Sequence, residues 1–410
     1  MRHLERIEYK PISARELFLE MKNLSELMID LAYSAALFND KGLGQHVLEL
    51  EDRVDSLAYL LEMEIMVAAR DPKDAEALLE FSIAASAANK ISDAAADITA
   101  IVMQNLGVHP IVAEVFERVE ERLVQTQASE GSVLVGKQLS ELDLAAKMGV
   151  DIIAIHRDKE WMINPKETVQ IKQGDVIVVR GTYSGIEDFI GLAEGKRRTL
   201  EEYGLSRRRE KQFKEIVERL VELKDTSELM IDLAYSSVLL NSRELAEEVQ
   251  RLEEYVDKLH TDFELLVLSS KCQKEDVRGF LGLIRLGVAA EKIADSAYEI
   301  AAPVLRGIVP HPVLKLALEE AEETVTYVQV AQDSPLVNKT LREARIPDET
   351  GMWVLAIRRG DRCLRPRGEW KIQAGDVLIA SGYAEGEEDL MKLASLSSVI
   401  PSDRSTSSNR

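Results

Sequence analysis

Carboxylates spaced four residues apart are the side chains of this chain best suited to bind a metal ion. Residues four apart share one helix face, where like charges repel unless they are exposed or neutralised. Two facing helices that each offer such a pair could hold a metal through oxygen ligands. Because the set has no histidine, a dedicated zinc site is less expected; the alternative is a solvated acidic face paired with lysines. The candidate ligands are Glu51, Asp55, Asp93, Asp97, Glu253, Asp257, Glu291, Asp295 and Glu299.

Arginines form the second candidate site, which would bind an anion. A guanidinium pairs with phosphate through two parallel hydrogen bonds, and late in the chain several arginines fall close together. The alternative interpretation is a solvated loop with local salt bridges. The candidate residues for a phosphate or nucleotide ligand are Arg157, Asn164, Arg358, Arg359, Arg362, Arg365 and Arg367.

Both sets of residues belong to a tandem duplication. The decapeptide Ser-Glu-Leu-Met-Ile-Asp-Leu-Ala-Tyr-Ser stands at residues 25–34 and again at 227–236, an offset of 202 residues. The offset continues through most of the chain and drops to 201 before Gly181 and Gly382, because one loop has lost a residue. This period is too long for a solenoid and predicts a duplicated multi-domain unit.

The two copies differ in their candidate residues. Copy one has Asn89 where copy two has Glu291, and the arginines are denser in copy two. If each chain has one working site, we expect it to be built from copy two, with copy one as its structural partner. One chain is predicted to contain an intramolecular pseudo-two-fold dimer, and the sequence leaves a further homodimer open.

Two kinds of element must position these residues. In the first part of each copy, apolar residues recur three and four apart, which predicts three long antiparallel helices and a short fourth in a bundle. In the second part, β-branched runs bounded by turn residues predict a small α+β domain. The expected fold class is multi-domain, with two all-α antiparallel helix bundles alternating with two small α+β modules. The expected boundaries are 10–127 (bundle 1), 128–195 (module 1), 206–328 (bundle 2), 329–396 (module 2) and 397–410 (a disordered tail).

Composition narrows the possible partners and location. The formal net charge of −21 argues against nucleic acid as a main partner, since phosphate backbones are bound by surfaces rich in lysine and arginine. No apolar run approaches the ~20 residues that span a bilayer. The first residues do not have the pattern of a signal peptide. These features predict a cytoplasmic protein.

The sequence also lacks the motifs of common catalytic and nucleotide-binding sites. No Gly-x-Gly-x-x-Gly follows a predicted strand, and there is no Walker loop, His-Glu-x-x-His motif or credible catalytic triad. We therefore expect no NAD, no ATP, no catalytic residue and no enzymatic activity.

The helical part of each copy resembles the PhoU family. Residues 51–55 would match its first metal motif, and Glu291 with Asp295 would match its second. The resemblance implies divalent metal ions bound at these motifs, although Asn89 departs from the pattern in copy one.

The α+β part of each copy resembles the TrkA C-terminal family, also called RCK-C. The resemblance implies modules that dimerise and bind a small regulator at their interface, and cyclic di-AMP is the ligand it suggests. Because members of that family are cytosolic regulators of potassium and other cation transport, it also implies a membrane transporter or channel subunit as partner. The protein would then lie at the membrane only through that partner. The matching residues are 149–157, Asn164, Gly174, Asp175, Gly181, Gly375, Asp376 and Gly382.

The two resemblances lead to one expected function and two alternatives. The modules favour a non-catalytic regulator of potassium or cation transport that senses a small ligand. The bundles alone would favour a PhoU-type regulator of phosphate uptake. A metal-binding protein with weak hydrolase activity is the third possibility.

Overall fold

The computed structural model defines most of the chain. The described residues are 7–106, 109, 111–116, 119, 121–195, 213–270, 277–308, 312, 316, 323–360, 362–364, 366 and 370–395. The tail expected at 397–410, together with Arg365 and Arg367, lies outside them. None of the helices in the described segments is both long and apolar enough to cross a membrane.

Long helices form in both copies where the apolar periodicity predicts them. Each of the three long helices of copy one begins after a side chain that caps its first amides, namely Ser13, Asp40 and Asp71. The helices of copy one are α1 (Ala14–Phe38), α2 (Lys41–Ala68), α3 (Pro72–Met103) and the short α4 (Ile111–Phe116). Those of copy two are α8 (Lys214–Leu239), α9 (Arg243–Ser269) and α10 (Val277–Leu305).

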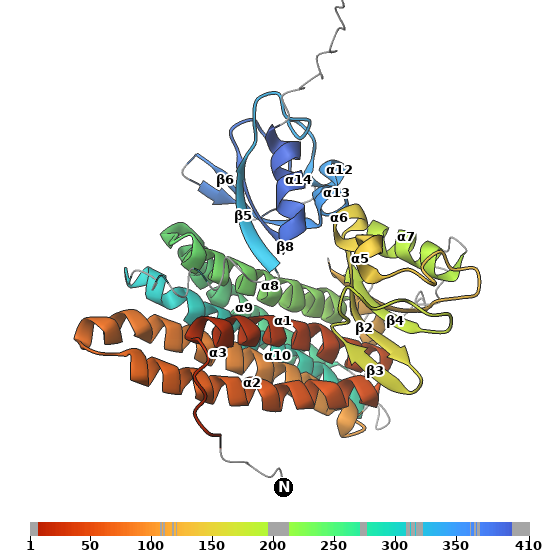
Figure 1. Ribbon diagram of the computed structural model, residues 1–410, viewed down its shortest axis with the longest axis horizontal. Coiled ribbons are helices and arrows are strands. Elements are labelled where there is room, and N and C mark those ends of the chain that lie inside the picture. Colours follow the sequence, from red (N-terminus) through yellow and green to blue (C-terminus); the bar gives the residue numbers. More distant parts are fainter. Residues whose placement is uncertain are drawn as a thin grey trace, which may run out of the picture.

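The two bundles pack into a single body with one continuous hydrophobic core. Helices α3 and α10 contact each other along its middle (Figure 1). Lys90 binds Glu299 and Lys292 binds Asp97, each at 2.6 Å, so the two helices run antiparallel. The two ion pairs are equivalent under the duplication. Such reciprocal contacts are characteristic of a two-fold interface, and here they join two halves of one chain.

Each module is a four-stranded antiparallel sheet with short helices. The strand orders are β1-β4-β2-β3 and β5-β8-β6-β7, so the two modules have the same topology. The strands are β1 (Arg122–Gln127), β2 (Val150–Arg157), β3 (Glu160–Ile163), β4 (Val176–Gly181), β5 (Glu323–Gln329), β6 (Met352–Arg359), β7 (Arg362–Leu364) and β8 (Val377–Tyr383). The helices are α5 (Leu139–Leu142), α6 (Leu144–Met148), α7 (Tyr183–Glu194), α12 (Leu341–Ala344), α13 (Ile346–Thr350) and α14 (Ala384–Ser395).

The sheet of each module begins earlier than the boundaries expected at residues 128 and 329. Strand β1 pairs with β4, and β5 pairs with β8 along its whole length. Both strands therefore belong to the modules. Strand β1 is short and mixes polar with apolar residues, which is why it gives a weaker sequence signal than the β-branched strands β2 and β4.

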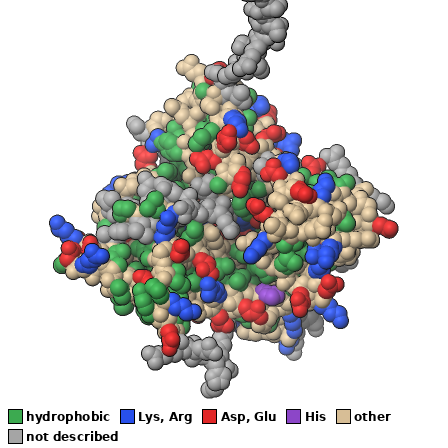
Figure 2. All heavy atoms as spheres, viewed as in Figure 1, with side chains coloured by type: hydrophobic (Ala, Val, Ile, Leu, Met, Phe, Trp, Pro, Cys, Tyr) green, Lys and Arg blue, Asp and Glu red, His purple; other side chains and the backbone are tan. Residues whose placement is uncertain are grey.

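In Figure 1, module 2 lies above the six long helices and module 1 lies at their right-hand end, and the two modules contact each other. Helix α6 of module 1 packs against α13 of module 2. Thr182 donates a hydrogen bond to Asp348 across this contact at 2.5 Å. The pairing of modules expected from the duplication is thus present within one chain. On the face shown in Figure 2, acidic and basic side chains are interspersed over both modules and helices.

Glu80 is a buried carboxyl group in the core of bundle 1. It is 3% exposed, and its Oε1 has no hydrogen-bond partner. Burial raises its pKa from 4.5 to about 7. The folded state therefore holds this proton more tightly than the unfolded state does. The protonated Glu80 therefore stabilises the folded state. This stabilisation is complete below pH 4.5 and is lost as pH rises from 4.5 to about 7.

We accordingly expect Glu80→Gln to raise the unfolding free energy at pH 8 by about 2 kcal/mol, because the charged form is no longer buried. The variant should also remove the fall in stability between pH 4.5 and 7. Urea unfolding across this pH range checks both effects, with the exposed Glu76 changed to Gln as the control. A Glu80→Gln variant that is less stable than the parent at pH 8 contradicts this assignment.

Candidate functional site

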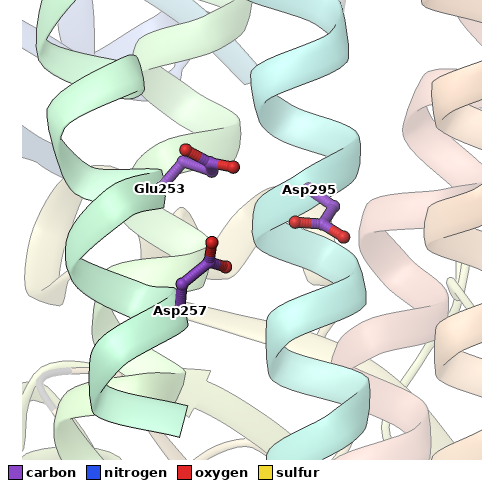
Figure 3. Close-up of side chains that lie close together, drawn as sticks. All are labelled: Glu253, Asp257 and Asp295. Atoms are coloured by element: carbon purple, nitrogen blue, oxygen red, sulfur yellow. The ribbon is translucent and has the colours of Figure 1, made fainter. Parts of the chain in front are cut away.

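Three candidate metal ligands of copy two meet on neighbouring helices. Glu253 and Asp257 project from α9 toward Asp295 on α10, and one oxygen from each lies within 4.8 Å of the others (Figure 3). Burial raises the pKa of both Glu253 and Asp295, and the neighbouring Asp257 carboxylate raises these values further. A divalent cation with oxygen ligands would offset this repulsion, so the donor set suits Mg²⁺, Mn²⁺ or Ca²⁺.

His260 lies beside this cluster and was not among the predicted ligands. It follows Asp257 by three residues on α9, and its ring lowers the pKa of Asp295 electrostatically. Its Nε2 is 3.6 Å from Glu264 Oε1 and makes no hydrogen bond. The spacing of three residues after a candidate ligand was the sequence signal that could have identified it. An imidazole nitrogen would widen the range of suitable metals to include zinc.

The remaining candidate metal ligands differ in their surroundings. Glu299 and Asp97 form the two ion pairs between α10 and α3. The pKa of Glu291 is raised by burial and then by Asp295. Among the described residues, the metal-like group of three carboxylates occurs in copy two.

In copy one, Glu51, Asp55 and Asp93 stand at the positions equivalent to Glu253, Asp257 and Asp295. Burial raises the pKa of Asp93 to about 6, and the nearby Asp55 and Glu51 carboxylates raise it further. Asn89 replaces the carboxylate that Glu291 supplies in copy two, and its side-chain oxygen is buried without a hydrogen-bond partner. That the working site belongs to copy two stays a prediction.

Two of the candidate anion-binding arginines form ion pairs with aspartates of their own modules. Arg157 donates from Nε and Nη2 to the two oxygens of Asp175 at 2.8 and 2.6 Å. Arg359 binds Asp376 in the same way, at 2.7 Å for both bonds. Each arginine also donates to a backbone carbonyl of its module. The pairing raises the pKa of both guanidinium groups, first through the side-chain hydrogen bonds.

Arg358 lies in a groove at the edge of module 2. Its guanidinium lies over the Tyr327 ring at 4.6 Å, and both residues line a groove of about 270 Å³ between module 2 and the α8–α9 turn. In copy one, His156 occupies the equivalent position and packs against Trp161, with ring centroids 4.9 Å apart and ring planes inclined at 48°. Trp161 also packs against Gly42 at the start of α2. The sheet register places Cys363 at the Trp161 position in copy two, so the residue at this position carries no indole.

The other candidate anion ligands are scattered or undescribed. Asn164 has a positive φ of 42° and lines a small cavity with Asp151, Arg180 and Tyr383. Arg362 is part of β7, but its side chain is not described. Arg365 and Arg367 lie outside the described residues. The structure therefore does not bring the predicted arginines together into one described site.

Comparison with known domain families resolves the architecture. The PhoU domain model matches residues 18–102 and 220–304, and the TrkA-C domain model matches residues 123–193 and 325–395. The chain is a tandem repeat of PhoU and TrkA-C domains. Both resemblances seen in the sequence are thereby confirmed, as is the expected fold class. The modules are the TrkA-C domains, and the metal-like carboxylates lie in the second PhoU domain.

Individual relatives share shorter parts of the chain. The Ktr system potassium uptake protein C of Bacillus subtilis is 40% identical over 70 residues, or 17% of this chain and 31% of that protein. The probable potassium channel protein 2 of Methanocaldococcus jannaschii is 36% identical over 86 residues, or 20% of this chain and 24% of that protein. This chain thus spans less than a third of the length of either relative.

A solved structure of PhoU from Pseudomonas aeruginosa is also similar in part. It has a TM-score of 0.39 and 15% sequence identity, and the match covers 72% of this chain and 96% of that chain.

Proposed function

We propose that this chain is a non-catalytic regulator of potassium or other cation transport that acts on a membrane transporter or channel subunit. The observation that carries the proposal is the pair of TrkA-C domains together with similarity to proteins named for potassium uptake and potassium channels. In this account the protein works on the cytoplasmic side of the membrane and reaches it only through its partner.

Regulation of phosphate uptake is the competing function, because the chain also carries two PhoU domains. Growth of a deletion strain separates the two functions. If the chain regulates potassium transport, loss of the gene alters growth at limiting potassium and leaves growth at limiting phosphate unchanged. The opposite pattern supports the phosphate alternative and contradicts our proposal.

Within this function, we place a small phosphate-bearing ligand such as cyclic di-AMP in the groove of module 2. Arg358 offers a guanidinium whose described contact is the Tyr327 ring, and arginine over an aromatic ring is suited to a nucleotide ligand. The intramodule ion pairs of Arg157 and Arg359 make those residues poorer candidates. Copy one fills the equivalent space with Trp161, which supports a single ligand per chain.

Arg358→Ala is therefore expected to weaken binding of cyclic di-AMP at least about tenfold, because a charge-assisted contact to phosphate is lost. Calorimetry on the full chain measures the affinity. The matched control is His156→Ala at the equivalent position of copy one, which should leave the affinity unchanged. An equal loss of affinity in the two variants, or unchanged affinity in Arg358→Ala, excludes the groove as the binding site. Binding by neither the parent nor the variants at tens of micromolar excludes this ligand.

The second PhoU domain is proposed to bind a divalent metal through Glu253, Asp257 and Asp295. Asp295→Asn removes one charge from the centre of the cluster, and we expect at least about a tenfold loss of Mn²⁺ affinity. Metal analysis after dialysis measures the loss. Asp93→Asn, the equivalent change in copy one, is the control and should retain the metal. A phosphatase screen of the metal-loaded protein tests the weak-hydrolase alternative.

A further inference from the structure

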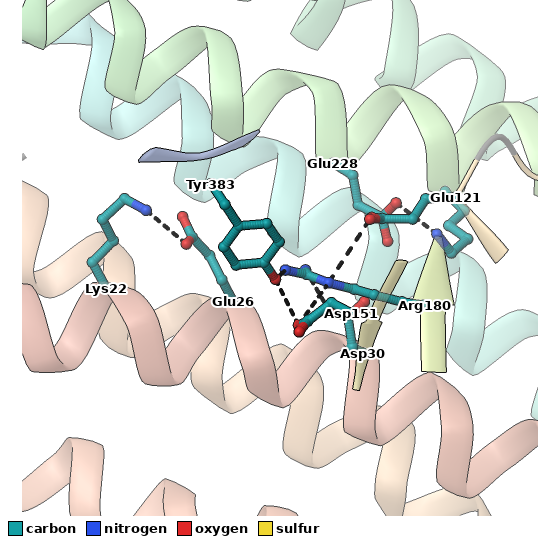
Figure 4. Close-up of polar contacts among 9 residues, drawn as sticks. Lys22, Glu26, Asp30, Glu121, Asp151, Arg180, Glu228 and Tyr383 are labelled. Atoms are coloured by element: carbon teal, nitrogen blue, oxygen red, sulfur yellow. Dashed lines mark hydrogen bonds and ion pairs between the residues drawn. The ribbon is translucent and has the colours of Figure 1, made fainter. Parts of the chain in front are cut away.

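Both sheets contribute residues to the core of the helical body, and in module 1 two further side chains reinforce this contact. Trp161 of β3 packs against that core, and its indole lies against Gly42 at the start of α2. Arg180 of β4 binds Asp30 of α1 at 2.8 Å (Figure 4). Module 1 is therefore held to bundle 1 by both an apolar and an ionic contact.

The residues of the apolar contact are replaced in copy two. The sheet register makes Cys363 the equivalent of Trp161, and the offset of 202 residues places Glu244 where copy one has Gly42. A tryptophan side chain buries about 150–250 Å² in such a contact, and a cysteine is far smaller. A groove of about 270 Å³ lies beside this position, lined by Glu244 from α9 and by Arg358 from module 2.

The residue of the ionic contact is replaced as well. Arg180 faces Asp151 in the sheet of module 1, and Ser381 faces Trp353, the equivalent of Asp151, in module 2. Arg180 and Ser381 are thus equivalent, and a serine carries no charge with which to form an ion pair. A cavity of about 150 Å³ lies beside Ser381 and Trp353. Because hollows forfeit van der Waals contacts, module 2 is packed on the helices less closely than a protein interior is packed.

Module 2 is instead fastened to module 1, at the last residue of β8. There Tyr383 donates a hydrogen bond to Asp151 at 2.6 Å and accepts one from Arg180 (Figure 4). Helix α13 packs on α6 beside it. The groove lies nearer the start of the same strand, at Ile379, and in Figure 1 the β6 side of module 2 lies away from module 1. Module 2 therefore has one fastened end and one end beside an open groove.

We propose that module 2 pivots on its contact with module 1 and that a ligand in the groove holds it against bundle 2. This inference concerns the regulation of the ligand site in the proposed function and rests on that function. Domains within a chain move relative to one another unless their interface is large and apolar. The groove has Tyr327 and Arg358 of the module on one side and Ser242 and Glu244 of the helices on the other. A ligand that contacts both sides binds the closed arrangement more tightly than the open one and shifts the population toward it.

The two sides of the groove also orient the ligand. Arg358 offers a guanidinium, which suits a phosphate group. Glu244 offers a carboxylate, which repels phosphate and accepts hydrogen bonds from groups such as the amino group of a base. A nucleotide therefore lies with its phosphate toward module 2 and its base toward the start of α9. Both residues line the same groove, so one small molecule can link the module to the bundle.

Distances between pairs of spin labels on the full chain, measured by pulsed electron paramagnetic resonance, test the movement. Arg251→Cys on α9 and Gln373→Cys on module 2 report on copy two, and Glu49→Cys with Lys172→Cys is the equivalent pair in copy one. All four positions are exposed, and the two native cysteines are first changed to serine. We expect the distance distribution in copy two to be about twice as broad as that in copy one, because module 2 occupies more than one position.

Two changes should narrow the distribution of copy two to the width of copy one. Saturating cyclic di-AMP should do so by linking the module to the bundle. Cys363→Trp combined with Glu244→Gly should do so without ligand, because it installs the contact that copy one makes. Trp161→Ala is the reciprocal change and should broaden the distribution of copy one. It keeps the proposal testable if the double variant does not fold.

Equal widths in the two copies of the parent protein overturn the proposal, as does an unchanged width in both the double variant and Trp161→Ala. A distribution that stays broad while calorimetry shows cyclic di-AMP bound also overturns it, since the ligand then does not join the two bodies. If calorimetry shows no binding, the ligand named in the proposed function is wrong. The variants then decide the movement of module 2 without any ligand.

Discussion

Arg359→Ala is expected to lower the unfolding free energy by about 3–5 kcal/mol, because it leaves a buried carboxylate without its partner. Asp376 is 1% exposed and receives two hydrogen bonds from Arg359 at 2.7 Å. It also accepts a hydrogen bond from the Gln373 amide at 2.8 Å. These bonds fix the Gly375–Asp376 turn that leads into β8, where Gly375 has a φ of 85°. Urea unfolding of the full chain measures the loss.

Two variants separate this structural role from ligand binding. Arg358→Ala, one residue earlier, loses a stacking contact and should cost less than about 1 kcal/mol. Arg359→Ala combined with Asp376→Asn should regain part of the lost stability, because no charge is then buried and the Gln373 amide keeps its acceptor. If Arg359→Ala is as stable as the parent, the ion pair is not the structural element we describe. We expect the same loss of stability in module 1 when the ion pair between Arg157 and Asp175 is broken.

Gly386→Ala is expected to destabilise module 2 by about 3 kcal/mol or more, because the added methyl group meets a backbone carbonyl. A Cβ at this position would lie 1.9 Å from the Thr350 oxygen. Since this oxygen is part of α13, the first turn of α14 must move away from that helix. Helix α13 also packs on α6 of module 1. The substitution should therefore loosen the contact between the modules as well.

Thermal unfolding of the full chain measures this effect. Gly185→Ala is the equivalent change in module 1, where the Cβ would lie 2.0 Å from the Met148 oxygen, and a similar loss is expected. Gly131→Ala is the control because nothing lies within 4 Å of its added Cβ. An unaltered melting temperature in both Gly386→Ala and Gly185→Ala would show that the helix can shift without cost.

Much of the fold followed from local patterns in the sequence. The apolar stripes of α1, α2 and α3 gave correct helices because burial of one face dominates the stability of long helices. The repeated decapeptide predicted the internal pairing of modules and bundles. Strand β1 was missed because four of its six residues have polar side chains and it lies at a partly exposed edge.

The candidate sites were harder to predict, because their partners are distant in sequence. Arg359 looked like an anion ligand since its charge is visible in the sequence, whereas its pairing with Asp376 depends on the sheet register. The sequence shows that Trp161 corresponds to Cys363. Only the structure shows that this position lies beside the groove lined by Arg358 and Tyr327. The pairing of Arg180 with Asp30 joins residues of a module and a bundle, which no periodicity reveals.

The most direct measurement of the central claim is the initial rate of rubidium uptake, as a potassium analogue, alongside phosphate uptake in the same cells. Deletion of the gene should change rubidium uptake and leave phosphate uptake unaltered. The parent gene should restore the original rate, and a stably folded Arg358→Ala variant should restore basal uptake without its response to ligand. Unchanged rubidium uptake together with altered phosphate uptake would contradict the account.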